Sequence, residues 1–187
     1  MQHNITPKKG CILVSKPLID DGFFEQSIVY LTAHDSEGSL GFALNKKSSM
    51  IVQDFLDGFP GREPIYYGGP VEQDALFYLH SFENIPGALH VGNKLYLGGD
   101  FEIFKTHCIH HNLEEGAILK PKFFLGYSGW SEGQLVEELE HNTWLLVDSP
   151  NVHDPLSLST NAWREYMKNK GGKYAIWANS PSDPMLN

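Results

Sequence analysis

Long apolar runs are missing from this chain of 187 residues. No stretch approaches the ~20 consecutive apolar residues that a membrane-spanning helix needs. The polar start from Met1 to Lys9 also lacks the apolar core of a signal peptide. We therefore expect a cytoplasmic protein that makes no use of a membrane. Repeats and low-complexity blocks are missing too, so we expect one domain over residues 1–178 and a disordered tail at 179–187.

Cysteine and basic residues are scarce. Only Cys11 and Cys108 occur, both in apolar stretches and without a CxxC pair, which predicts buried, reduced thiols and excludes a cysteine-based zinc centre. The 14 Lys and Arg residues against 23 Asp and Glu give a net charge of −9. Since duplex DNA is bound largely through basic side chains, we expect no direct nucleic acid binding. We interpret the basic segment Arg164–Lys173 as a solvated helix end.

Aromatic residues are plentiful at 12%, and short β-branched and aromatic runs predict most of the secondary structure. Strands are expected at 10–17, 26–33, 40–45, 64–67, 76–80, 94–97, 120–126, 144–147 and 174–177. Helices are expected after a cap at Ser48 or Ser49, after Asp100, after a capping box of Ser131 and Gln134, and up to Gly171. Strands outnumber helices and do not alternate with them, which predicts an α+β domain with a bent, mostly antiparallel sheet.

Four sequence blocks between residues 10 and 144 carry a family resemblance. They are GCILVSKPLIDDGFFEQSIVYLTAH from Gly10, GSLGFALNK from Gly38, YYGGPVEQDALFYLH from Tyr66 and LGYSGWSEGQLVEELEHNTW from Leu125. In order and spacing they resemble the AlgH/YqgE family of small bacterial proteins. The resemblance implies a sheet folded into a partial barrel with flanking helices. It implies little about activity, and the family label of transcriptional regulator has no matching DNA-binding motif in this chain.

Three polar residues at the ends of predicted strands are the first candidates for a binding site. His34, Asn45 and His80 each lie inside a matched block beside a long apolar run. The ends of neighbouring strands commonly meet at one rim, where a pocket can form. The alternative is that all three hydrogen-bond the backbone of the turns next to them.

Glycine and aromatic residues extend the candidate set to Gly68, Gly69, Tyr127, Trp130 and Gln134. The two glycines follow a predicted strand but have neither the lysine nor the spacing of a nucleotide-binding loop. The two aromatic residues are either a ligand platform or part of the core. The run from 126 to 130 does not fit the GxSxG nucleophile motif, and we interpret it as a tight turn before a helix.

Metal and cofactor binding are not expected. His107 and His111 have the four-residue spacing of a two-histidine zinc site, but no glutamate lies between them as in HExxH, and no third ligand is evident. We interpret both as surface histidines beside an apolar stripe.

We favour a non-enzymatic binding or regulatory protein whose loops receive a protein partner or a small-molecule ligand. The reason is that the sequence shows no pattern typical of a nucleophile–base pair or of a set of metal ligands. The alternative is a hydrolase-like or nucleotide-dependent enzyme with His34 or His80 as general base. That alternative requires an imidazole within hydrogen-bond distance of an acid or a hydroxyl inside a cleft.

Overall fold

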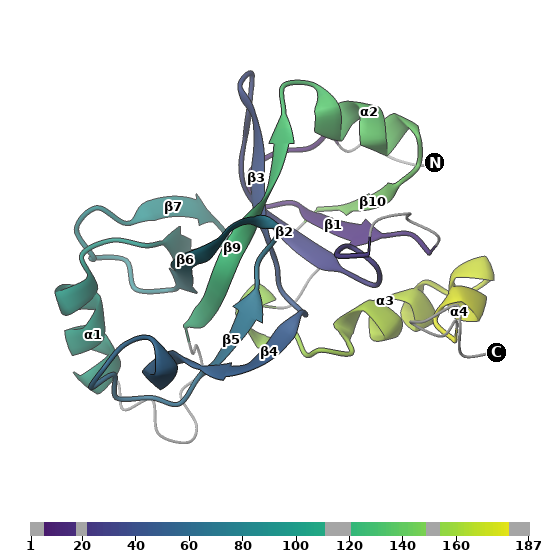
Figure 1. Cartoon of the computed structure of the whole chain (residues 1–187). Helices are drawn as coiled ribbons and strands as arrows, with labels where there is room; N and C mark the ends of the chain where they lie inside the picture. The colour runs from purple at the N-terminus through teal and green to yellow at the C-terminus, as the bar shows by residue number, and fades with distance from the viewer. Residues whose placement is uncertain (1–5, 18–21, 111–120, 149–153, 180–187) are drawn as a thin grey trace.

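The computed structural model describes residues 6–17, 22–110, 121–148 and 154–179. Ten strands form one sheet in the order β10-β1-β2-β3-β9-β6-β8-β7, with β4 paired to β5 and β5 to β9 (Figure 1). Within these ranges every pairing is antiparallel except that of β5 with β9. The sheet is strongly bent but does not close into a barrel. The predicted α+β class is confirmed.

Strands and helices follow one another irregularly along the described residues. The strands are β1 Ile12–Ser15, β2 Ile28–Asp35, β3 Gly38–Ala43, β4 Lys47–Ile51, β5 Pro64–Tyr67, β6 Val71–His80, β7 Leu89–Gly92, β8 Leu95–Leu97, β9 Lys122–Ser131 and β10 Trp144–Val147. The helices are α1 Phe101–His110, α2 Gln134–Glu140, α3 Ala162–Lys170 and α4 Lys173–Trp177, with short 3₁₀ turns η1 Val52–Asp54 and η3 Pro155–Ser157.

Strand β9 joins the two halves of the sheet. Its outer residues 128–131 pair with β3, while its inner residues 122–127 pair with β6 and, over 123–125, also with β5. Gly126 lies where the partners change, and its φ is +67°. A Cβ at this position would lie 2.6 Å from the Val71 carbonyl oxygen, so both the backbone conformation and the space require glycine.

Three buried clusters form the core, and each contacts a different helix. Phe104 and Cys108 of α1 pack with Phe123 of β9 in one cluster. Leu135 of α2 packs with Trp130 and Trp144 in the second. Helix α3 contributes Trp163 and Met167 to the third, which includes Tyr30 and Phe42 of the sheet. Cys11 and Cys108 are both buried and free, as predicted.

The prediction of a helix after Ser48 is wrong. Residues 47–51 instead form strand β4, which pairs with β5, and only the short turn η1 follows. The Ser48 hydroxyl donates to the Ile65 carbonyl at 2.8 Å rather than capping a helix. The helical spacing of the apolar residues is satisfied differently, since Val52 and Phe59 are buried in the α1 cluster through irregular backbone.

Two further expectations differ from the structure. The tight turn expected at 126–130 is the continuous interior of β9, and the strand expected at 174–177 is helix α4. The rings of Tyr174 and Trp177 pack against the α3 cluster, and this tertiary contact outweighs the strand preference of a short aromatic run. The tail expected at 179–187 lies outside the described residues from 180 onward. Across the described ranges, no helix combines the length and apolar character that crossing a bilayer demands.

A buried lysine gives a test of the packing between β9 and the segment after η3. The Lys122 side chain is 4% exposed, donates to the Leu158 carbonyl at 2.9 Å and lies 4.2 Å from the centre of the Tyr66 ring. Burial lowers its pKa from 10.5 to about 7, and the negative charge of Asp154 opposes this only in part.

We predict that stability rises with pH because of Lys122. Between the folded pKa of about 7 and the ordinary value of 10.5, the unfolded chain binds one more proton than the folded chain. The free energy of unfolding should therefore increase across this window by up to about 1.4 kcal/mol per pH unit. Urea denaturation should show this increase in the wild type and a smaller one in Lys122→Met. If the free energy of unfolding changed equally with pH in the wild type and in Lys122→Met, the lowering of the Lys122 pKa by burial would be contradicted.

Candidate functional site

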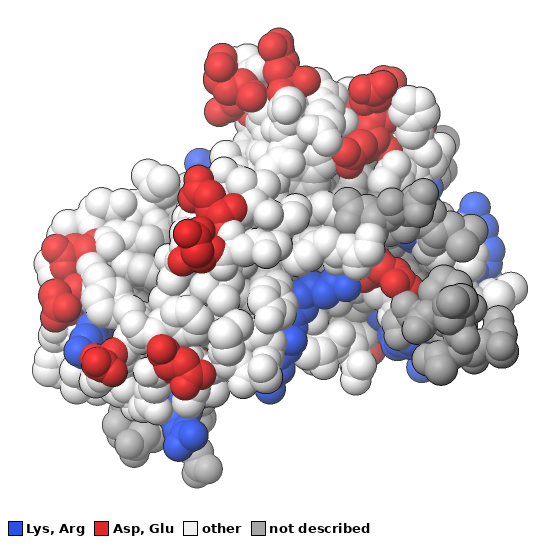
Figure 2. All heavy atoms as spheres, viewed as in Figure 1, with Lys and Arg blue, Asp and Glu red and all other residues white. Residues whose placement is uncertain are grey.

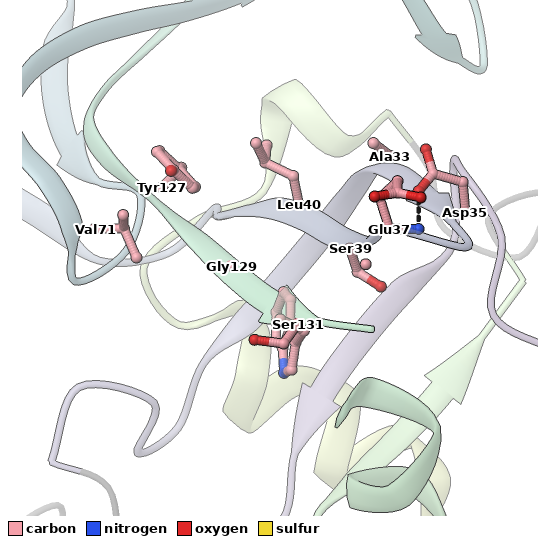
Figure 3. Close-up of a pocket in the computed structure, with 11 residues that line it drawn as sticks. Ala33, Asp35, Glu37, Ser39, Leu40, Val71, Tyr127, Gly129 and Ser131 are labelled. Atoms are coloured by element: carbon pink, nitrogen blue, oxygen red, sulfur yellow. Dashed lines mark hydrogen bonds between the residues drawn. The ribbon is translucent and has the colours of Figure 1, made fainter. Parts of the chain in front are cut away.

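An open groove of about 440 Å³ lies where the β2–β3 hairpin and the end of β9 project from the rest of the sheet (Figure 3). Residues of β2, β3, β6, β9 and the hairpin turn line it: Ala33, Asp35, Glu37, Gly38, Ser39, Leu40, Val71, Tyr127, Gly129, Trp130 and Ser131.

The strand register places the groove on the face of the hairpin that α2 does not cover. Ala33 pairs with Leu40, which pairs with Gly129, so these three residues share one face. His34 pairs with Ser39, and Ser39 pairs with Trp130, which puts those side chains on the reverse face. Trp130 packs with Leu135 of α2 on that reverse face. Helix α2 thus supports the groove from behind.

The two ends of the groove differ in chemistry. Asp35 and Glu37 lie at one end, where an Asp35 carboxylate oxygen accepts from the Glu37 backbone N–H at 2.8 Å (Figure 3). Val71 and Tyr127 lie at the other end, and the Tyr127 ring stacks edge-on with Phe77 at 5.8 Å. In the space-filling view, acidic side chains gather at the top of the molecule, over the hairpin and α2 (Figure 2).

Gly129 forms the bare floor between these ends. It is exposed, and a Cβ built on it would lie 3.3 Å from Cε2 of Tyr127 and 3.8 Å from Cγ2 of Val71. Its side-chain-free backbone therefore leaves room beside an apolar wall formed by Leu40 and Val71. Among the described residues that line the groove, none carries a positive charge. The groove is suited to a ligand with an aliphatic stem and a cationic end.

The structure brings four of the predicted site residues to this hairpin. Tyr127 and Trp130 line the groove, and Nδ1 of His34 forms a 2.7 Å hydrogen bond with the Ser39 hydroxyl on the reverse face. The Gln134 side chain accepts from the Ser131 backbone N–H at 3.0 Å and donates to Glu138 at 3.0 Å. The predicted capping box is thus half formed, since Gly133 rather than Ser131 precedes the helix.

Glu138 fixes the aromatic support of the groove. One of its carboxylate oxygens accepts from the indole N–H of Trp130 at 2.9 Å and from that of Trp144 at 2.7 Å. The other accepts from Gln134. Trp130 and Trp144 are therefore core residues of the α2 cluster, held by one carboxylate, and Trp130 also lines the groove.

Gly68 and Gly69 are not among the residues that line the groove, and they pack closely against the backbone of β9. A Cβ at Gly69 would lie 2.0 Å from the carbonyl of Tyr127, and one at Gly68 would lie 2.3 Å from the Gly126 carbonyl oxygen. The Gly68 carbonyl accepts from the Ser128 hydroxyl at 2.9 Å. These glycines let the chain between β5 and β6 cross β9 closely, and they present no side chain to a ligand.

Asn45 and His80 lie away from the groove. The Asn45 amide accepts from the Ile28 N–H at 2.9 Å and donates to the Gln26 carbonyl at 2.8 Å, at the opposite end of the β2–β3 ladder from His34. The strand ends do not converge on one rim because antiparallel neighbours end at opposite edges.

His80 is buried in the α1 half of the molecule. Its Nε2–H donates to the Gly98 carbonyl at 2.9 Å, and its Nδ1 accepts from the Phe82 N–H at 3.2 Å. Burial lowers the pKa of His80, with the nearby His107 as a smaller contribution in the same direction. Both nitrogens of the neutral imidazole are hydrogen-bonded. His80 therefore links the backbone at Phe82 to that at Gly98 and has no free nitrogen for a substrate.

The described residues contain no group of three or more potential metal-ligating side chains. His107 lies on α1, where its Nδ1 bonds the Ile103 carbonyl at 2.9 Å, and His111 lies outside the described ranges.

Comparisons with known proteins establish the family. The AlgH-like family model (DUF179) matches residues 12–175. The chain belongs to the AlgH-like family. It is 38% identical to the UPF0301 protein BF2109 of Bacteroides fragilis, over 99% of this chain and 94% of that protein. A UPF0301 protein of Cytophaga hutchinsonii is 37% identical, over 96% of this chain and 98% of that protein.

Two solved structures resemble this chain in fold. The solution structure of AlgH from Pseudomonas aeruginosa is 26% identical, covers 97% of this chain and 98% of that one, and gives a TM-score of 0.67. The crystal structure of DIP2367 from Corynebacterium diphtheriae gives a TM-score of 0.75 at 16% identity, with 95% of each chain covered, and shows the shared fold. The predicted resemblance to the AlgH/YqgE family is confirmed.

Several groove residues of this AlgH-like protein were not predicted from the sequence. They are Ala33, Asp35, Glu37, Gly38, Ser39, Leu40 and Val71, whereas Gly129 and Ser131 lie between the predicted site residues Tyr127 and Gln134. The signal that would have found the first of them is the short turn between two predicted strands, because a hairpin places residues two apart on one face. The hairpin residues lie beside Val71 and Gly129 only because strands far apart in the sequence pair with one another.

We predict that Asn45 stabilises the fold rather than binding a ligand. Asn45→Ala leaves the Ile28 N–H without its buried acceptor, which should lower the free energy of unfolding by about 1–3 kcal/mol. Urea denaturation measures this, with Asn179→Ala as an exposed control that should change stability by less than about 0.5 kcal/mol. Unchanged stability in Asn45→Ala would show that the side chain is available for another role.

Proposed function

We propose that this AlgH-like protein is a non-enzymatic, cytoplasmic binding protein whose hairpin groove receives a cationic, partly aliphatic segment of a protein partner. The observation that carries the proposal is the composition of the groove. Two carboxylates lie at one end, an apolar wall at the other, and a bare glycine floor lies between them. A lysine or arginine side chain has the matching form, with an apolar stem and a charged end.

The shape of the site favours a protein segment over an enclosed small molecule. The groove is open, and along the edge of β9 opposite β3 the pairing with β6 stops at Tyr127. In the described part of the chain, residues 128–131 therefore have no strand on that edge. An extended segment that added there as a strand would gain main-chain hydrogen bonds and place alternate side chains in the groove.

A regulatory role fits such a site when the partner makes the contact with nucleic acid. The net charge of −9 opposes direct binding to a duplex, and the groove adds two further carboxylates at the binding surface. Regulation of transcription, the role given by the family label, would then act through the bound protein.

We predict that filling the groove abolishes binding and that neutralising its acidic end weakens it. The probes are short synthetic peptides with one lysine between aliphatic residues, and the same peptides with norleucine in place of lysine. The lysine peptides should shift the backbone amide resonances of Gly129 and Ser131, and the norleucine peptides should not. Gly129→Val should abolish the shifts because its side chain occupies the floor, and the extended backbone there accepts a β-branched residue.

A charge-matched pair of double variants separates local from overall charge. Asp35→Asn with Glu37→Gln should weaken binding about tenfold or more, since a charge-assisted hydrogen bond contributes about 1.5–3 kcal/mol. Glu132→Gln with Glu140→Gln removes the same charge outside the groove and should leave binding nearly unchanged. Equal losses in both pairs, or lysine peptides that shift no hairpin resonance, would contradict the proposed function.

One observation favours the enzymatic alternative. The 2.7 Å contact between His34 and Ser39 is a base–hydroxyl pair, as a hydrolase would need. However, Ser39 is only 9% exposed, and its side chain lies on the face towards α2 rather than on the groove floor. We therefore interpret the pair as a cross-strand hydrogen bond.

A covalent probe distinguishes the two functions. A fluorophosphonate reacts with activated serine hydroxyls, and we expect no labelling of Ser39, detected by mass spectrometry of the intact protein. Ser39→Ala and His34→Ala should also keep the peptide-induced shifts of Gly129. Labelling of Ser39 that disappears in His34→Ala would establish a catalytic dyad and refute the non-enzymatic proposal.

A further inference from the structure

The end of the molecule formed by α3 and α4 differs in chemistry from the rest of the surface. From Tyr166 to Asn179 the sequence contains three lysines and no acidic residue, although the whole chain carries a charge of −9. Basic side chains appear at the right-hand end of the space-filling view, where α3 and α4 lie, while acidic ones gather at the top (Figures 1 and 2). The charge is thus unevenly distributed over this acidic protein.

Lysines and aromatic rings alternate on this surface. Lys170 Nζ lies 5.0 Å from the centre of the Tyr174 ring, and Lys173 Nζ lies 5.5 Å from the same ring and 5.6 Å from that of Trp177. Lys16, which follows β1, contributes a third ammonium group from a distant part of the sequence. Its Nζ donates to the Asn142 side-chain oxygen at 3.0 Å, and burial, then the charges of Lys173 and Lys170, lower its pKa.

An apolar side chain projects beside these charges. Ile176 is 73% exposed, the highest value among the large hydrophobic residues that the structure describes as exposed, and no residue of α4 is buried. Residues three and four apart share a helix face, so Ile176 and Trp177 lie beside Lys173. An exposed aliphatic side chain flanked by lysines and partly buried aromatic rings is typical of a helix that lies in the headgroup layer of a membrane.

We propose that the α3–α4 end docks on an anionic lipid bilayer. Ile176 enters the boundary between headgroups and acyl chains, and Lys16, Lys170 and Lys173 neutralise acidic headgroups. The exposed isoleucine favours lipid over nucleic acid, because a phosphodiester backbone offers no apolar layer to receive it. We expected no use of a membrane because long apolar runs are missing. Such runs are needed to span a bilayer, but a protein can lie against one without them.

Vesicle co-sedimentation of the full chain tests this docking. The protein should sediment with vesicles that mix phosphatidylglycerol and phosphatidylcholine and stay in solution with pure phosphatidylcholine. Raising the salt concentration should release it. Lys16→Gln/Lys170→Gln/Lys173→Gln should lower the partition coefficient at least about tenfold. Ile176→Ser, which keeps the charge, should lower it about threefold or more, because an aliphatic side chain no longer leaves water.

A matched triple variant and a competing probe complete the experiment. Lys47→Gln/Lys94→Gln/Lys105→Gln removes the same charge elsewhere and should sediment like the wild type. Equal loss in both triple variants, or no sedimentation with phosphatidylglycerol, would overturn the proposal. Binding of a polyglutamate peptide to the α3–α4 end without vesicle binding would assign the surface to an acidic protein instead. Groove variants such as Gly129→Val should sediment normally, so the two proposals can fail independently.

Discussion

The exchange of partners along β9 is the constraint on which the rest of the structure depends. One strand pairs with β3 over its outer part and with β5 and β6 over its inner part. The exchange is possible because Gly126 adopts a positive φ and because Gly68 and Gly69 let another segment cross at close range. Any side chain at these positions would collide with backbone atoms, so the hairpin and the α1 half of the sheet are coupled through three glycines.

The groove follows from this arrangement. Since β6 leaves β9 at Tyr127, the outer part of β9 and the β2–β3 hairpin project as a three-stranded ribbon with two faces. Helix α2 covers one face and is held there by Glu138, which accepts hydrogen bonds from Trp130 and Trp144. The other face keeps Gly129 bare between Leu40 and Tyr127. A rigid reverse side and an uncovered front are the combination expected of a preformed binding surface.

The sequence predicted the fold class and most strands because β-branched and aromatic runs are local signals. It failed at residues 47–59, where apolar spacing is helical but pairing of β4 with β5 decides the structure. It found Tyr127 and Trp130 because they lie in a recognisable block, yet it missed Asp35 and Val71, whose meeting depends on the pairing of β9 with strands far away in the sequence. His34, Asn45 and His80 were grouped as strand ends, although antiparallel pairing separates the ends of consecutive strands.

Site-specific photocrosslinking in cells tests whether the uncovered face of the hairpin is the binding surface. A benzophenone amino acid at Leu40 lies on the groove wall, and the same residue at Glu140 lies on exposed α2. We expect a discrete crosslinked protein from position 40 that disappears when Asp35→Asn and Glu37→Gln are added, and none from position 140. Crosslinking from position 140 alone, or from position 40 without dependence on the two carboxylates, would contradict the assignment of the binding surface to this face.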